Sequence, residues 1–209
     1  DFDKLCVSCR DDDSDYCPRS AHEGGWLGYY IGKNTALKDL TLYANPLDGF
    51  SDDAIELFCM GVNSNRSIRK ISFSHMDLSG RFFQSLRPCF ENNQNLSKLV
   101  VSHCRFGAGS ARQLSLALEG SIGSLKCIVL RRNEMGTGEQ LVEIINALSA
   151  HPQLEKIQFS TMNIGRHECT ALADLLRVTF SELRTLSLYN NGIDDEGVDA
   201  LAGALVKCN

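Results

Sequence analysis

The chain has 209 residues, of which 43% are hydrophobic, and a formal net charge of −5. This apolar content supports a substantial packed core and excludes an intrinsically disordered chain. The acidic balance argues against nucleic acid as the main partner, and no run of about 18 apolar residues is available to span a membrane.

Nine cysteines are present. Disulfide frameworks are typical of short, core-poor secreted domains, and this chain is neither short nor core-poor. We therefore expect mostly reduced cysteines in an intracellular, cytoplasmic protein. Residue 1 is Asp rather than Met, so a removed targeting segment, an organellar location or a longer parent chain all stay open.

Residues 1–36 are expected to form a strand, an acidic loop and a helix. Phe2, Leu5 and Val7 have the spacing of a core-facing strand, and the acidic run 11–15 that follows predicts a solvated loop, with a metal site as the alternative. The segment 26–35 predicts the helix and its exit turn. Cys6, Cys9 and Cys17, with His22 as a fourth ligand, are a candidate zinc site. The alternative is ordinary surface or loop cysteines, because a second closely spaced pair is missing.

From residue 37 onward the sequence repeats. Positions 1, 4, 6 and 11 of each unit are apolar, beginning with Leu37, Leu40, Leu42 and Leu47. The units start at residues 37, 68, 96, 125, 154 and 183, which gives a period of 28 to 31 residues. All 24 of these positions are apolar, so chance does not explain the pattern.

This period and pattern resemble the long leucine-rich repeat of the ribonuclease-inhibitor-like family, in which each unit contains one strand and one helix. The clearest copy is LRTLSLYNNGIDDEGVDALAGALVKCN, residues 183–209. The resemblance implies an α/β solenoid, or horseshoe, with a parallel β-sheet on the concave face and α-helices on the convex face. We predict a single domain over 1–209, with 1–36 as a degenerate first repeat. The segment 26–35 also resembles the leucine-rich-repeat proteins of diatoms and related algae.

The two halves of each unit have different periodicities. Positions 4 and 6 lie two residues apart, so both face the core from one strand. The second halves predict amphipathic helices, whose apolar faces include Leu141, Ile144, Ile145 and Leu148 in one unit and Val198, Leu201, Ala202 and Leu205 in the last. Ser51 is the expected N-cap of another helix.

Position 9 of the unit is often Asn in this family, where it satisfies the backbone of the tight exit turn. Asn45, Asn133 and Asn191 keep this residue. The other three units have Met76, Cys104 and Met162 there, which predicts apolar packing and looser turns.

The outward positions of the strands and exit turns carry more Lys and Arg than Asp and Glu, although the whole chain has 21 against 26. We predict that this concave face binds a partner protein with an acidic surface. The predicted binding residues are Tyr43, Lys70, Ser74, His75, Lys98, His103, Arg105, Arg131, Arg132, Lys156, Tyr189 and Asn190. The alternative is a mixed solvated surface with no binding role.

No catalytic constellation is evident. His75 and His103 are expected one strand spacing apart, but Cys104 should point inward and no carboxylate is placed to orient either ring. The glycines of 107–109 and 136–138 fit tight repeat turns rather than a phosphate-binding loop. We therefore predict a non-catalytic protein-binding scaffold without a cofactor or metal.

Two alternative functions stay open. One is a regulator of an enzyme or GTPase, like the Ran GTPase-activating proteins, although the acidic tail typical of those proteins does not follow the repeats here. The other is the sensor part of a larger receptor, like the NOD-like proteins. Neither end of the chain shows a polar cap, so we expect a longer natural protein or an end covered by a partner.

Overall fold

The computed structural model describes residues 3–9, 16–78, 82–107, 109–121, 124–135, 138–179 and 181–206. Its strands form one parallel sheet in chain order. The strands are β1 (Lys4–Ser8), β2 (Asp39–Tyr43), β3 (Lys70–Ser74), β4 (Lys98–Ser102), β5 (Cys127–Arg131), β6 (Lys156–Ser160) and β7 (Thr185–Ser187). The acidic run 11–15 lies outside the described residues, so its metal interpretation is untested.

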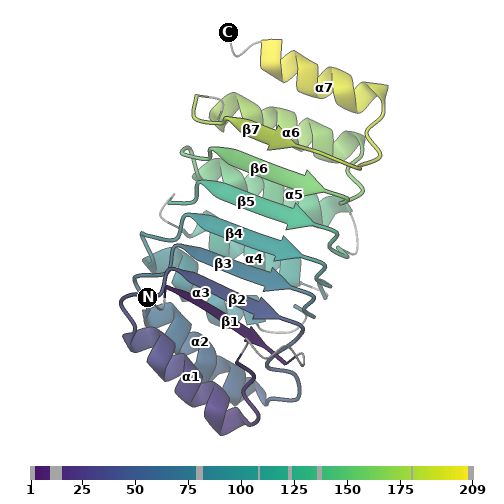
Figure 1. Ribbon diagram of the computed structural model, residues 1–209. Helices are drawn as coiled ribbons and strands as arrows, with labels where there is room; N and C mark the ends of the chain where they lie inside the picture. The colour runs from purple at the N-terminus through teal and green to yellow at the C-terminus, as the bar shows by residue number, and fades with distance from the viewer. Residues whose placement is uncertain are drawn as a thin grey trace.

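One helix follows each strand, and the helices form a second layer on one side of the sheet (Figure 1). They are α1 (Ala21–Lys33), α2 (Asp52–Ser64), α3 (Phe82–Asn92), α4 (Ser110–Glu119), α5 (Gly138–Ala147), α6 (Arg166–Thr179) and α7 (Asp195–Val206), with a 3-10 turn at Leu148–Ala150. The two termini lie at opposite ends of the stack. The predicted α/β solenoid is confirmed. No described helix is long and apolar enough to cross a membrane.

The strands pair without any register slip. Position 4 of each unit is aligned with position 4 of the next, as in the pairing of Leu40 with Ile71 and of Ile71 with Leu99. A parallel pair needs a crossover connection, and the helix of each unit supplies it. Equivalent residues of the repeat therefore lie in one column across the sheet, although the unit length varies from 28 to 31 residues.

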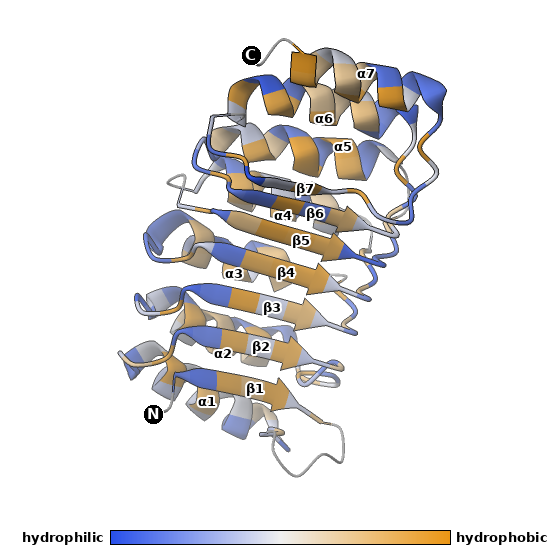
Figure 2. Cartoon of the chain, turned by 45° about the horizontal axis from the view of Figure 1, so that its top comes forward, coloured by the Kyte–Doolittle hydropathy of each residue, from blue (hydrophilic) through white to orange (hydrophobic). Residues whose placement is uncertain are grey.

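The core is built from the apolar positions that define the repeat. Of the 24 residues at positions 1, 4, 6 and 11, 19 are buried. The others, Met135 and the four residues of the last unit, are half-buried. Figure 2 shows these hydrophobic residues as bands along the strands. The last unit is less buried because a repeat fills its core only when another repeat stacks on each side.

The predicted helix faces are correct in the interior of the stack and wrong at its end. Leu141, Ile144, Ile145 and Leu148 are all buried. In α7, however, Val198, Ala202 and Leu205 are exposed, whereas Gly197 and Ala204 are buried. Spacing alone cannot choose between two apolar faces when a helix has a neighbour on one side only.

The exit turns share one backbone conformation. The residue at position 8 has a positive φ in every unit from 37 onward: Ala44, His75, His103, Arg132, Thr161 and Asn190, with φ between 49° and 58°. The turns with Met76, Cys104 and Met162 adopt it as well, and their expected loosening stays a prediction. Their side chains are buried, as predicted.

The asparagines at position 9 bind backbone groups across the turns, as the resemblance implied. The Asn191 side chain accepts hydrogen bonds from the amides of Met162 and Ile164, and it donates to the carbonyls of Phe159 and Leu188. Such bonds satisfy buried backbone groups that the strands leave unpaired. Asn133 and Asn191 bond in this way to the preceding repeat, whereas Asn45 accepts from the amide of Asp77 in the following repeat.

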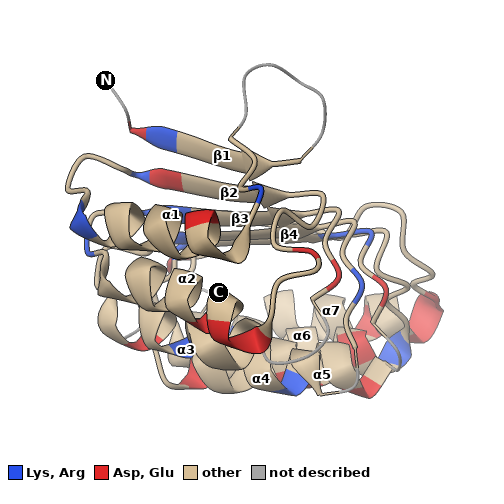
Figure 3. Cartoon of the chain, turned by 90° about the horizontal axis from the view of Figure 1, so that it is seen from below, with Lys and Arg blue, Asp and Glu red and all other residues tan. Residues whose placement is uncertain are grey.

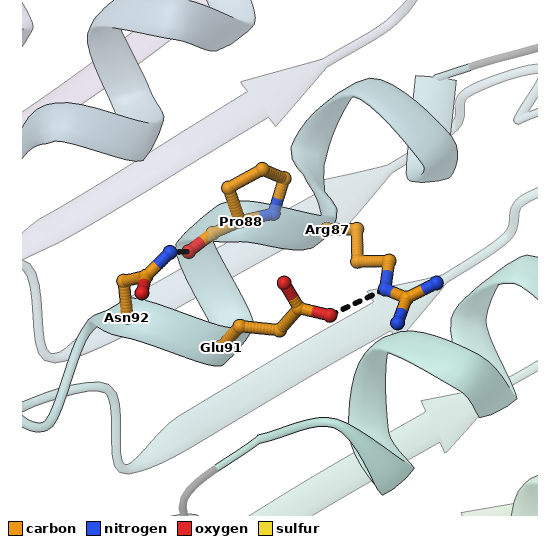
Figure 4. A network of polar contacts seen from close by, with 4 residues as sticks. All are labelled: Arg87, Pro88, Glu91 and Asn92. Atoms are coloured by element: carbon orange, nitrogen blue, oxygen red, sulfur yellow. Dashed lines mark hydrogen bonds and ion pairs between the residues drawn. The ribbon is translucent and has the colours of Figure 1, made fainter.

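Helix α3 contains a proline and keeps its shape through local side-chain contacts. Pro88 lacks a backbone N–H and so removes one helical hydrogen bond. The Arg87 guanidinium contacts the Glu91 carboxylate at 2.5 Å, and the Asn92 side-chain amide donates to the Pro88 carbonyl at 3.0 Å (Figure 4). Both contacts bridge residues four apart, the spacing that places side chains on one helix face.

The cysteine prediction is wrong at the N-terminal end. Cys9 and Cys17 form a disulfide, so neither can supply a thiolate to zinc, and the zinc interpretation fails with them. Cys6, Cys59, Cys89, Cys104, Cys127 and Cys169 are not disulfide-bonded. Most of the described cysteines are thus reduced, as expected. Disulfides persist mainly in oxidising compartments, so the intracellular location stays a prediction.

Helices α1 and α2 pack unusually closely because both present glycines at their contact. A Cβ atom added to Gly61 would lie 1.8 Å from the carbonyl oxygen of Gly28, and one added to Gly28 would lie 2.6 Å from the Cα atom of Phe58. Backbone atoms on the neighbouring helix leave no room for these additions. The residue type at this contact therefore sets the distance between the first two repeats.

We expect Gly61→Ala to lower the free energy of unfolding by about 2 kcal/mol or more, because the helices must separate to admit the methyl group. Gly203→Ala is the matched control: nothing lies within 4 Å of its added Cβ, and alanine favours a helix by up to about 1 kcal/mol. Urea denaturation of both variants measures the difference. Equal stabilities would contradict the close packing of α1 and α2.

A buried histidine makes the fold sensitive to pH. His151 is 1% exposed and its Nε2 lies 3.1 Å from the Ser121 hydroxyl. Its Nδ1 atom is buried without a hydrogen-bond partner among the described residues. Burial lowers the pKa of His151, only partly opposed by the backbone at Leu118, so the folded protein favours the neutral ring.

We expect the free energy of unfolding to fall as the pH drops below about 6.5. The unfolded chain takes up a proton at His151 near that pH, whereas the folded chain does so only at lower pH. Urea denaturation between pH 7.5 and 5 should show a weaker decline for His151→Gln than for His22→Gln, a control at an exposed histidine. The same decline in both variants would assign the effect to other groups.

Candidate functional site

Figure 3 shows the helices on one side of the sheet, and we call the other side the open sheet face. A five-residue strand directs its first, third and fifth side chains to one side of the sheet. In β2 and β4 the first, third and fifth residues are half-buried and the second and fourth are buried. This alternation follows from the two-residue period of a strand. The outward residues therefore form three rows across the sheet, continued by the exit turns.

Three predicted binding residues form a ladder of rings. The Tyr43 ring meets the His75 ring edge to face at 5.3 Å between centroids, and His75 stacks on His103 at 4.5 Å and 8°. The stacking distance is close to the spacing of neighbouring strands. The expectation that the two histidines lie one strand spacing apart is confirmed.

Several groups hold His103 in its neutral form. Its pKa is lowered, first by partial burial and then by His75, Arg132 and Arg131. Each of these three neighbours raises the free energy of a protonated His103 ring. The lowered pKa favours the neutral ring of His103.

The cysteine that follows His103 is not an available nucleophile. Cys104 is 1% exposed, and burial raises the pKa of its thiol to about 11, so the thiol is protonated and points inward as predicted. Among the residues that the structure describes, no group of three or more His, Cys, Asp and Glu side chains could hold a metal ion.

Two of the predicted cations are already paired. Lys70 lies 3.6 Å from the Asp39 carboxylate, and Arg105 binds the Asp77 carboxylate. These acids stand on the neighbouring unit, in the same row as the cation they pair with. Lys70 and Arg105 therefore contribute less free positive charge to the face than their sequence positions implied.

Four other cations have no carboxylate partner within the described ranges: Lys98, Lys156, Arg131 and Arg132. Lys98 and Lys156 lie on either side of Cys127, and both act to lower the pKa of its thiol against the larger effect of burial. Arg131 and Arg132 are exposed at the end of β5. All four come from β4, β5, β6 and the turn after β5.

The remaining predicted residues bond to neighbouring side chains or are exposed in the last unit. The Ser74 and Ser102 hydroxyls are 3.1 Å apart beside the ring ladder, and the Asn190 amide donates to the Thr161 hydroxyl at 3.1 Å. Tyr189 is 77% exposed in the last unit. The predicted surface is thus a ring ladder, a cationic cluster and a separate C-terminal part.

A feature between the charged rows was missed. Val100 and Val129 are aligned neighbours at the centre of β4 and β5, half-buried on the open sheet face. They continue a middle row without charged residues, composed of Thr41, Ser72, Val100, Val129, Gln158 and Ser187. The repeat register already placed this row on the outward side, but the predicted binding residues were chosen from polar and charged positions and did not include it.

We expect the Arg131→Gln and Arg132→Gln double variant to raise the pKa of His103, because it removes two neighbouring charges that lower it. Proton NMR titration of the His103 ring measures the shift. Arg112→Gln, on the exposed side of α4, should leave the pKa unchanged. A His103 titration that ignores the double variant would show that the arginines point away from the ring.

The comparisons with known proteins agree with this geometry. A leucine-rich-repeat family model matches residues 182–202, all of which except Glu182 lie within the clearest repeat copy. No curated protein matches the chain in sequence. The diatom resemblance stays a prediction.

Two solved structures share the fold at low sequence identity. The leiomodin-1 actin-binding site 2 aligns with a TM-score of 0.56 and 11% identity, covering 79% of this chain and 92% of that chain. The tropomodulin C-terminal domain of Caenorhabditis elegans aligns with a TM-score of 0.54 and 12% identity, covering 78% and 94%. Together with the seven in-register strands, these matches show that the chain has a leucine-rich-repeat fold, and the family model matches its last repeat.

Proposed function

We propose that the chain is a non-catalytic scaffold whose open sheet face binds a partner protein with an acidic surface. The observation that carries this proposal is the cluster of Lys98, Lys156, Arg131 and Arg132, which lack carboxylate partners within the described part of the chain. Four like charges on one rigid sheet repel one another in the free protein. An acidic partner relieves that repulsion and adds attraction.

The charge balance of the whole molecule makes this cluster stand out. The chain carries a net charge of −5, so an acidic partner is repelled by most of the surface and attracted by this face. Such contrast guides the orientation of an encounter and raises its rate. Arginine is also enriched among residues that contribute most to interface affinity.

The solved structure with a similar fold from leiomodin-1 is named as an actin-binding site. At 11% identity this likeness concerns the fold alone, and a shared fold does not fix a partner. It does make actin a reasonable first protein to test. Actin as the partner, and an intracellular location, are parts of this proposal.

We expect the Arg131→Glu and Arg132→Glu double variant to lose its partner while its melting temperature stays nearly unchanged, because both side chains are exposed. The control is Arg112→Glu with Lys33→Glu, which changes the net charge equally on the exposed sides of α4 and α1. The measurements are co-sedimentation with purified actin, and a pull-down from the native source with mass spectrometry.

A protein retained by the wild type and the control, but lost by the double variant, would support the proposal and name the partner. If every retained protein bound all three forms equally, the interface would lie elsewhere. The cationic cluster would then be a solvated surface.

A further inference from the structure

The cationic cluster has an internal order. Lys98 and Lys156 occupy the first position of their strands, which we call the entry row. Arg131 and Arg132, at the end of β5 and in its exit turn, form the exit row. Val100 and Val129 lie between the two rows. The surface is therefore an apolar strip with positive charge on both sides.

The distance between the two rows suits a helix. They are separated by four residues of extended strand, or about 13 Å. An α-helix with its side chains is about 10–12 Å across. A helix laid across the strands on the valine pair would place one flank over the entry row and the other over the exit row.

The spacing along the stack also favours a helix over an extended peptide. Neighbouring strands are about 4.8 Å apart, and one turn of a bound helix rises about 5.4 Å. The two spacings differ by only about 0.6 Å, so successive helical turns stay close to successive strands. In an extended peptide, successive side chains on the same side are about 6.6 Å apart. This spacing differs from the strand spacing by about 1.8 Å, three times the difference for a helix. The two edges of an extended peptide also carry backbone groups rather than side chains, so it cannot engage both charged rows at once.

We propose that the open sheet face over β4, β5 and β6 binds an amphipathic α-helix that runs across the strands. Its apolar stripe lies on Val100 and Val129, and acidic side chains on both flanks meet the entry row and the exit row. This inference rests on the proposed function, since it names the kind of acidic partner. A globular acidic surface or an extended acidic peptide would satisfy the proposed function without satisfying this inference.

The test uses three synthetic peptides of about 16 residues, long enough to form a helix when bound. The first has a leucine stripe flanked by Glu on both sides, with Ala elsewhere. The second has the same composition in an order that mixes Leu and Glu around the helix. The third is the first with two central Pro residues, which break a helix. Fluorescence anisotropy at low salt measures affinity, and circular dichroism measures helix formation.

Two double charge reversals separate the rows. Lys98→Glu with Lys156→Glu reverses the entry row, and Arg131→Glu with Arg132→Glu reverses the exit row. The matched control is again Arg112→Glu with Lys33→Glu. Melting temperatures establish that each variant is folded before binding is compared.

We expect the striped peptide to gain helicity on binding and to bind at least about tenfold more tightly than the mixed or the proline peptide. Each row reversal should weaken its binding by at least about tenfold, whereas the control should bind like the wild type. Both rows must contribute, because a helix on the valine pair touches both.

Three outcomes would overturn the helix proposal. They are equal binding of the striped and mixed peptides, sensitivity to one row only, and no binding of the striped peptide. None of these affects the proposed function, which fails only if no partner is lost on reversal of the exit row in the pull-down. The two proposals can therefore fail separately.

Discussion

The in-register stacking of the repeats is the constraint on which the rest of this structure depends. One strand and one helix cannot bury the apolar side of either element, so each unit is stable only against its neighbours. The pairing of Leu40, Ile71 and Leu99 in consecutive strands shows how this works. The constant strand register returns the same residue position to the same place, and the core becomes a continuous column. A change of one residue in the strand register would turn that column outward.

The same register organises the surface. Because position 8 adopts a left-handed backbone in every exit turn from Ala44 onward, the side chains there leave the sheet in one direction. His75 and His103 stack for this reason, and the ring of Tyr43, at the preceding position of its unit, meets His75 edge to face. In the middle row, the register aligns Val100 with Val129. Both the stacked rings and the valine pair follow from the repetition of the strands.

Electrostatics then divides this surface into parts with different roles. Lys70 and Arg105 are neutralised by acids of neighbouring units, and such exposed pairs contribute little to stability. The cations on β4, β5 and β6 have no such partner within the described residues, and they surround an uncharged strip. A partner with acidic side chains and an apolar stripe would pair with these cations and cover the valines between them. This match is the basis of the helix proposal.

Sequence periodicity by itself determined the fold, the core columns and which side chains face outward. These are properties of a repeating backbone, and they need no knowledge of individual contacts. The tertiary structure alone decided that Cys9 and Cys17 are joined and which face α7 buries. It also separated the paired cations Lys70 and Arg105 from the four without partners. These outcomes depend on distances between side chains from different repeats, which a pattern along one chain does not contain.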